Sequence, residues 1–239
     1  MKRKIFLSLI VFALFLTVPV TAFAKGPAKK NIDYVALGDS LAAGTTPYNE
    51  SGKGYTDYLV DRFEQSQYTV NFANLGVPGY TSANVLIDVT SKPEVQTKIR
   101  QAEYVTIDVG ANDLLPLIRT PKEIPQATKQ VGINISIILS TIEQLNPDAK
   151  VYVMGYYFPF PYASDQEKEF LIPLLDGLNQ VIETAVVLNN DTFIPTGKVI
   201  AKNYETYIPN PQNIHLSSEG YQIIAKEFWK KVDKSKDKH

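Results

Sequence analysis

The sequence predicts a three-layer α/β/α domain built on a parallel β-sheet. Short apolar runs, each followed by glycine or proline, alternate along the chain with longer segments of helical period. Strands that alternate with helices of ten or more residues form βαβ units, which need a parallel sheet covered on both faces. No internal repeat interrupts this pattern. The length of 239 residues therefore fits one domain, expected over residues 32–232, against a soft prior of about 150 residues per domain.

Five segments have the apolar, β-branched or aromatic composition of strands. They are Ile32–Leu37, Tyr68–Leu75, Tyr104–Val109, Val151–Met154 and the shorter Thr192–Ile194. In an open parallel sheet the ligand crevice lies beyond the carboxyl ends of the strands. Residues that take part in a functional site are therefore expected just after these five segments.

Helical period accounts for the long segments between the strands. Tyr55–Gln65 and Ile124–Leu145 repeat apolar residues at three- and four-residue spacing, which indicates amphipathic helices. Two further helices are predicted from their caps, one near residue 165 and one at the end of the chain. The expected capping residues are Ser164 with Glu167, and Ser217 or Ser218.

The first 24 residues have the pattern of a secretory signal peptide. Three basic residues, Lys2 to Lys4, precede the apolar run Ile5–Val18, and Ala22-Phe23-Ala24 is a small-x-small cleavage signal. A membrane anchor is the alternative, but the run is shorter than the roughly 20 apolar residues that a spanning helix needs. We expect cleavage after Ala24 and a secreted protein. Residues 25–31 are then a short linker, and residues 233–239 a charged tail.

Composition excludes several classes of protein. The chain has no cysteine, so disulfide scaffolds, cysteine-ligated zinc modules, iron–sulfur clusters and thiol nucleophiles are ruled out. Without residues 1–24 the chain keeps 21 basic and 25 acidic residues, a net charge of −4. This sign argues against a nucleic-acid partner, which normally requires a basic face. Of the two histidines, His239 ends the charged tail, which leaves His215 as the one sensible imidazole base.

The residues just after the predicted strands combine a nucleophile with a base and hydrogen-bond donors. Ser40 follows the first strand, Gly76 ends the second, Asn112 follows the third, and His215 precedes the last helix. A serine hydroxyl needs an adjacent base to become a nucleophile. Acyl transfer also needs donors for the negative charge that develops on the carbonyl oxygen. The backbone N–H groups of Ser40 and Gly76 and the side-chain amide of Asn112 are candidates for that oxyanion hole.

These four short blocks, in this order, resemble the signature of the SGNH, or GDSL, hydrolases. The resemblance covers nearly the whole chain after residue 24 and implies a flavodoxin-like sheet of five parallel strands. It also implies hydrolysis of carboxylic esters, including lipids and acetylated sugars, through an acyl-enzyme without a metal or organic cofactor. By the resemblance, Ser40 is the nucleophile and His215 the general base. Ser40, Gly76 and Asn112 would form the oxyanion hole.

The sequence departs from this family at one position. The family usually has an aspartate three residues before its histidine, and here Gln212 occupies that place. A carboxylate orients the imidazole and stabilises its cation, whereas an amide only orients it. The third member of the site is therefore left open between Gln212 and Asn213.

Other functions are compatible with parts of the sequence. A non-catalytic surface or glycan-binding protein on the same fold would explain Gln212, and a deacetylase of O-acetylated glycans or wall polymers would bind a cell-surface polymer. Metal-dependent phosphoester hydrolysis would use the aspartates near the strand ends. Those aspartates are Asp39, Asp108 and Asp113. The aromatic segment Tyr156–Tyr162 is expected either to form an acyl- or sugar-binding wall or to pack its rings on one another.

Overall fold

The computed structural model describes residues 30–234 and contains a five-stranded sheet of order β2-β1-β3-β4-β5. Every neighbouring pair in it is parallel. The strands are β1 (Lys30–Gly38), β2 (Tyr68–Gly76), β3 (Tyr104–Asp108), β4 (Lys150–Gly155) and β5 (Thr192–Pro195). The predicted three-layer α/β/α class with five parallel strands is confirmed.

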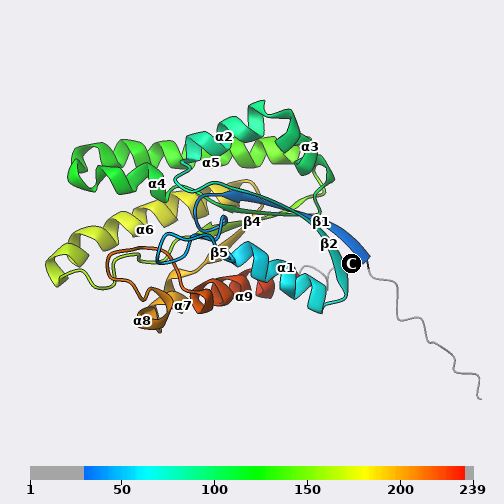
Figure 1. Cartoon of the computed structure of the whole chain (residues 1–239). Coiled ribbons are helices and arrows are strands. Elements are labelled where there is room, and N and C mark those ends of the chain that lie inside the picture. The colour runs from blue at the N-terminus through cyan, green and yellow to red at the C-terminus, as the bar shows by residue number, and fades with distance from the viewer. Residues whose placement is uncertain (1–29, 235–239) are drawn as a thin grey trace, which may run out of the picture.

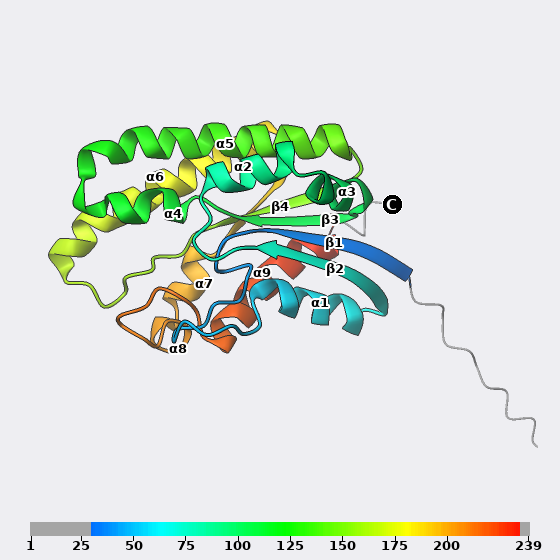
Figure 2. The ribbon, with the colours of Figure 1, turned by 45° about the horizontal axis from the view of Figure 1, so that its top comes forward.

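Helices cover both faces of this sheet (Figure 1). The longer helices are α1 (Tyr55–Gln65), α2 (Ser82–Ser91), α3 (Pro93–Gln101), α5 (Ile124–Leu145), α6 (Asp165–Leu188) and α9 (Ser218–Lys234). The shorter ones are α4 (Ala111–Leu114), η1 (Leu115–Arg119), η2 (Pro121–Glu123), α7 (Gly197–Ala201) and α8 (Tyr204–Tyr207). Helices α1 and α9 lie side by side on one face, and α2, α3, α5 and α6 lie on the other (Figure 2).

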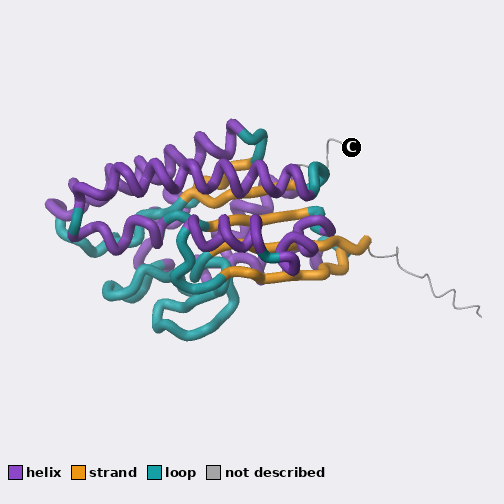
Figure 3. The backbone as a smooth tube through the Cα atoms, turned by 90° about the horizontal axis from the view of Figure 1, so that it is seen from above, coloured by secondary structure: helices purple, strands orange, loops and turns teal. Residues whose placement is uncertain are grey.

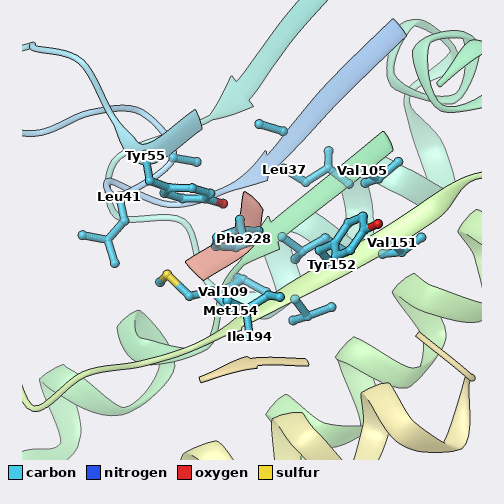
Figure 4. Close-up of a cluster of buried hydrophobic side chains, with 14 of the residues drawn as sticks. Leu37, Leu41, Tyr55, Val105, Val109, Val151, Tyr152, Met154, Ile194 and Phe228 are labelled. Carbon is cyan, nitrogen blue, oxygen red and sulfur yellow. The ribbon is translucent and has the colours of Figure 1, made fainter. Parts of the chain in front are cut away.

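Apolar side chains from the sheet and both helical layers form one continuous core. Strand β3 is buried along its whole length, as expected for a central parallel strand. On the α1–α9 face, the ring of Tyr55 stacks on Phe228 with centroids 4.8 Å apart, among the side chains drawn in Figure 4. Burying a side chain of the size of Phe228 stabilises the fold by roughly 1.5–3 kcal/mol.

Helix starts follow the caps that the sequence suggests. Ser164 Oγ accepts from the Glu167 N–H, and the Glu167 side chain accepts from the Ser164 N–H, which completes the capping box of α6. At α9, Ser217 Oγ accepts from the Gly220 N–H over 3.2 Å. Of the two candidates for this last cap, Ser217 is therefore the one in place.

Helix α6 is, by length and apolar composition alone, the one described helix that satisfies the criteria for crossing a membrane. In this fold it packs beside α5 and against β4 and β5. Its buried residues are Leu178, Ile182, Ala185 and Val186. Its first half carries exposed apolar side chains, including Phe170 and Ile172.

Two boundaries differ from the expectation. Strand β1 begins at Lys30, inside the predicted linker, because Lys30 and Asn31 pair with Tyr68 and Thr69 of β2. Helix α9 extends to Lys234, two residues into the predicted tail. The predicted signal peptide, residues 1–24, and most of that tail lie outside the described residues.

The longer loops gather at one end of the sheet (Figure 3). This end is where the strands finish, since β1, β2 and β3 are parallel and Gly38 is in register with both Gly76 and Asp108. The segments after these three strands are thus brought to one edge.

Candidate active site

Ser40 lies on a tight turn directly after β1. Its neighbour Asp39 shapes this turn, because Asp39 Oδ1 accepts from the Leu41 N–H over 2.9 Å and the Asp39 carbonyl accepts from the Ala43 N–H over 3.1 Å. Gly38 enters the turn with φ of +155°, and a Cβ on it would collide with Asp108. Only glycine fits there, and the turn directs Ser40 toward the loop end of the sheet.

The hydroxyl of Ser40 contacts the imidazole of His215. Ser40 Oγ lies 2.8 Å from His215 Nε2, although 175 residues separate the two in the chain. This is hydrogen-bonding distance for a nucleophile and its base. The structure thus brings together the two residues that the sequence marked as nucleophile and base.

The partner on the far side of the imidazole is Asn213. Asn213 Oδ1 lies 2.6 Å from His215 Nδ1 and also accepts from the backbone N–H of His215 over 2.9 Å. Gln212 does not take this place, because its side chain is exposed and its backbone N–H is donated to Asn210 Oδ1. The expectation for Gln212 is corrected, and of the two open candidates Asn213 makes the contact.

Burial lowers the pKa of His215 below its usual value of 6.5. The imidazole is about half-buried, and a buried environment disfavours its cation. His215 is therefore neutral at neutral pH, which is the form that accepts a proton from a serine hydroxyl.

Two of the expected oxyanion donors are available at this edge. The Ser40 backbone N–H has no hydrogen-bond partner among residues 30–234. Asn112 Nδ2 donates one hydrogen to the Tyr80 carbonyl over 3.0 Å, which fixes the amide and leaves its second hydrogen for a ligand. Both residues line the same cavity.

Gly76, the third expected donor, is already engaged. Its N–H is donated to Asn74 Oδ1 over 3.0 Å, and a Cβ on it would collide with Ala42 and Ala43. Gly76 therefore serves the close packing of β2 against the turn after Ser40. The expectation that its N–H faces the substrate is wrong for this structure.

Gly79 precedes Tyr80, whose carbonyl holds the Asn112 amide, and is a candidate donor that the sequence reasoning missed. It has φ of +84°, and Tyr80 N–H bonds to the Val77 carbonyl over 3.0 Å, which together make a type II turn with Pro78 at its second position. The Gly79 N–H has no partner in the part of the chain that the structure describes, and the space at its α-carbon is open. The Pro-Gly dipeptide is the signal that would have identified it.

A buried polar network supports the turn from below. Tyr55 Oη donates to Asp108 Oδ1 over 2.7 Å, and Asp108 Oδ2 accepts from the N–H groups of Asp39 and Ala42 over 3.2 Å. Tyr156 Oη donates to Asp39 Oδ2 over 2.8 Å. Burial, followed by the negative charge of Asp39, raises the pKa of Asp108 well above its usual range.

The three aspartates of the metal hypothesis belong to two different networks. Asp39 and Asp108 brace the turn, whereas Asp113 accepts from the N–H and hydroxyl of Ser82 over 2.8 and 2.6 Å. No group of three or more histidine, aspartate or glutamate side chains among residues 30–234 is arranged to hold a metal. These carboxylates therefore accept hydrogen bonds from backbone N–H groups and hold the segments around the site in place.

An apolar cavity opens beside Ser40 and His215. Its volume is about 90 Å³. Most of its apolar lining comes from three segments: Leu114, Leu115, Ile118 and Ile124; Tyr156, Tyr157, Phe158, Pro159 and Phe160; and Leu171, Leu174, Leu175 and Leu178. The aromatic segment after β4 thus forms a wall of this cavity, except for Tyr162, which packs on Tyr204.

Comparison with known proteins gives concordant results. The profile described as "GDSL-like Lipase/Acylhydrolase family" matches residues 36–223. The uncharacterized protein YpmR of Bacillus subtilis (strain 168) is 27% identical over 216 residues, which span 86% of this chain and 83% of YpmR.

Solved structures share the fold at lower identity. The lipase Lip_vut3 from a goat rumen metagenome superposes with a TM-score of 0.71 at 22% identity, over 82% of this chain and 95% of the lipase. Axe2, an acetylxylan esterase from Geobacillus stearothermophilus, superposes with a TM-score of 0.66 at 16% identity, over 86% of this chain and 95% of Axe2.

Proposed function

Because the chain belongs to the GDSL-like lipase/acylhydrolase family, we propose that it hydrolyses carboxylic esters through an acyl-enzyme on Ser40. The observation that carries this proposal is the 2.8 Å contact between Ser40 Oγ and His215 Nε2 at the mouth of the apolar cavity. The neutral imidazole and the unpaired donors beside Ser40 support it.

In the first half-reaction Ser40 Oγ bonds to the ester carbonyl carbon while its proton passes to His215 Nε2. The carbonyl oxygen becomes an oxyanion, which the N–H groups of Ser40 and Gly79 and the amide of Asn112 stabilise. His215 then gives the proton to the leaving alcohol as the C–O bond breaks. Water repeats the sequence on the acyl-enzyme: His215 takes its proton, the acid is released, and Ser40 recovers its hydrogen.

The lining of the cavity supports a hydrocarbon acyl chain as the preferred acyl group. Leu115, Ile118, Leu171 and Leu175 present only apolar surface beside the nucleophile. Each CH₂ buried there contributes about 0.8 kcal/mol to binding, so an acyl chain longer than acetyl gains apolar contact with this lining. We therefore propose medium-chain esters as better substrates than acetate esters.

Removal of the nucleophile tests the reaction. The wild-type protein should hydrolyse aryl esters and react stoichiometrically with a fluorophosphonate probe, and Ser40→Ala should do neither. Equal hydrolysis by the two proteins would overturn the proposal. A wild-type protein that resists the probe but binds glycans would favour the non-catalytic surface protein.

A series of acyl lengths tests the substrate class. We expect kcat/KM to rise from acetyl to octanoyl esters in the wild-type protein, and Leu175→Trp, which fills the cavity, to lose this rise while it keeps acetyl hydrolysis. Ile172→Trp is the matched control, because Ile172 lies on the same helix, is 41% exposed and does not line the cavity. Preference for acetyl esters, above all acetylated polysaccharide, would favour the deacetylase of a cell-surface polymer.

Export is part of the proposal and has its own test. The basic start, apolar run and Ala22-Phe23-Ala24 signal support cleavage after Ala24. Protein recovered outside the producing cell should begin at Lys25. Recovery of the full-length chain inside the cell alone would contradict export.

A further inference from the structure

The side-chain amide of Asn213 lies between the imidazole of His215 and the side chain of Asn49. On one side, Asn213 Oδ1 faces the His215 backbone N–H at 2.9 Å and His215 Nδ1 at 2.6 Å. On the other side, Asn213 Nδ2 donates to Asn49 Oδ1 over 2.8 Å. The partner of His215 Nδ1 is thus an amide that a second amide holds in turn.

The orientation of this amide decides which imidazole nitrogen carries the proton. A backbone N–H only donates, so the Asn213 atom that faces the His215 N–H must be the acceptor Oδ1. The same oxygen faces His215 Nδ1, which must then be the protonated nitrogen. Nε2 is left with its lone pair toward the Ser40 hydroxyl, which is the tautomer that a general base requires.

Asn49 holds the amide in that orientation. A flipped Asn213 would present its NH₂ group to two donors, and the Asn49 oxygen opposes such a flip by accepting from Nδ2. Asn49 has φ of +60°, and its N–H bonds to the Thr46 carbonyl over 3.0 Å. A second contact, Asn210 Nδ2 to the Pro47 carbonyl over 2.8 Å, joins the same two loops.

We infer that Asn49 is a positioning residue, which acts through Asn213 to keep His215 in the Nδ1–H tautomer. The loop that follows the Ser40 turn thereby sets the tautomer of an imidazole on a loop far along the chain. The tautomer is a property of the resting protein, while its effect on turnover rests on the proposed function.

Nuclear magnetic resonance of ¹⁵N-histidine reads the tautomer directly. The chain has only His215 and His239, so His239→Gln assigns the signals of both imidazoles. We expect His215 to be Nδ1–H in the wild-type protein and in Gln212→Ala, and to lose this tautomer in Asn213→Ala. Asn213→Asp keeps an oxygen that faces both the His215 backbone N–H and His215 Nδ1, so it should keep the Nδ1–H tautomer. An Nε2–H imidazole in the wild type, or an unchanged one in Asn213→Ala, would overturn the inference.

Two variants separate the role of the Asn49 side chain from that of its backbone conformation. Asn49→Gly removes the side chain and tolerates the positive φ, whereas Asn49→Asp keeps an acceptor for Asn213 Nδ2. We expect Asn49→Gly to populate both tautomers and to lose kcat on the order of tenfold with KM unchanged, as a misplaced catalytic group does. Asn49→Asp should have the single Nδ1–H tautomer and the kcat of the wild-type protein. A glycine variant with wild-type tautomer and kcat would exclude a role for Asn49.

The two proposals fail differently. If wild-type Ser40 does not react with the fluorophosphonate probe, the proposed function fails, and the tautomer of His215 in the Asn49 and Asn213 variants still decides the inference. If Ser40 reacts and the tautomer does not respond, only the inference fails.

Discussion

The Tyr156 hydroxyl donates to Asp39 Oδ2 over 2.8 Å and joins the end of β4 to the turn that carries Ser40, the proposed nucleophile. Both side chains are buried, so no water replaces this donor if it is removed. The contact fixes the carboxylate that in turn holds the Leu41 N–H. The geometry of Ser40 therefore depends on a residue 117 positions later in the chain.

Tyr156→Phe should lower both stability and turnover. Loss of a hydrogen bond to a buried charged group costs about 1.5–3 kcal/mol, measured as a decrease in the free energy of unfolding in urea. Tyr104→Phe is the control, because its hydroxyl lies at the other end of the sheet and makes no hydrogen bond among residues 30–234. Equal stability and kcat in the two variants would show that the contact has no such role.

Asn112→Ala should slow the reaction and leave the fold intact. Its amide is held by the Tyr80 carbonyl with one hydrogen toward the cavity, and removal of one oxyanion donor lowers kcat by about 10² to 10³. KM should change little, because the charge exists only near the transition state. Steady-state kinetics with an aryl ester measures this, and a loss confined to KM would contradict the assignment.

The acid limb of the pH profile should have its midpoint below pH 6.5. Turnover needs neutral His215, and burial lowers the pKa of His215 below that value. Asn213→Asp places a carboxylate beside the imidazole, which favours the cation and should move the midpoint up by about 1 to 3 pH units. The measurement is kcat/KM against pH for the two proteins, and a downward shift in the variant would contradict it.

Asp191 should make the protein less stable as the pH rises. Burial, followed by the charge of Glu143, raises the pKa of Asp191 from 3.8 to about 7. The folded chain thus keeps a proton that the unfolded chain releases, so the stabilisation is complete below pH 3.8 and is lost as the pH rises to about 7.

Asp191→Asn is neutral at every pH and tests this directly. Its Tm should exceed that of the wild type at about pH 8 and approach it at about pH 4. Exposed Asp148→Asn is the matched control. A constant difference in Tm across this range would contradict the assignment.

The strands could be predicted because each apolar run ends at glycine or proline, and the long helices because their period or caps are explicit. Helices α2 and α3 were not predicted. Each is ten residues or shorter, and the capping box of α2 pairs Thr81 with Asn84 in place of the usual glutamate or glutamine. Their packing against α5 supplies the stability that their sequences do not signal.

Within the candidate site, the types of the residues and their order could be predicted from the sequence, but the hydrogen bonds between them could not. Counting three residues back from His215 points to Gln212, whereas the chain folds into a turn in which Asn213 Oδ1 accepts from the N–H two residues later. Likewise, Gly76 and Gly79 are both glycines near the end of β2, and the sequence does not distinguish them. Only the three-dimensional structure shows which N–H is already bonded.

The order of the elements has a consequence for protein synthesis. All five strands end by Pro195, whereas the proposed base lies at residue 215, after the last strand and the short helices α7 and α8. A chain whose synthesis stops before residue 215 therefore contains every strand and Ser40 but lacks the imidazole. Hydrolysis by Ser40 would begin only when nearly the whole polypeptide has been made. An incomplete chain is therefore expected not to hydrolyse esters where it is synthesised.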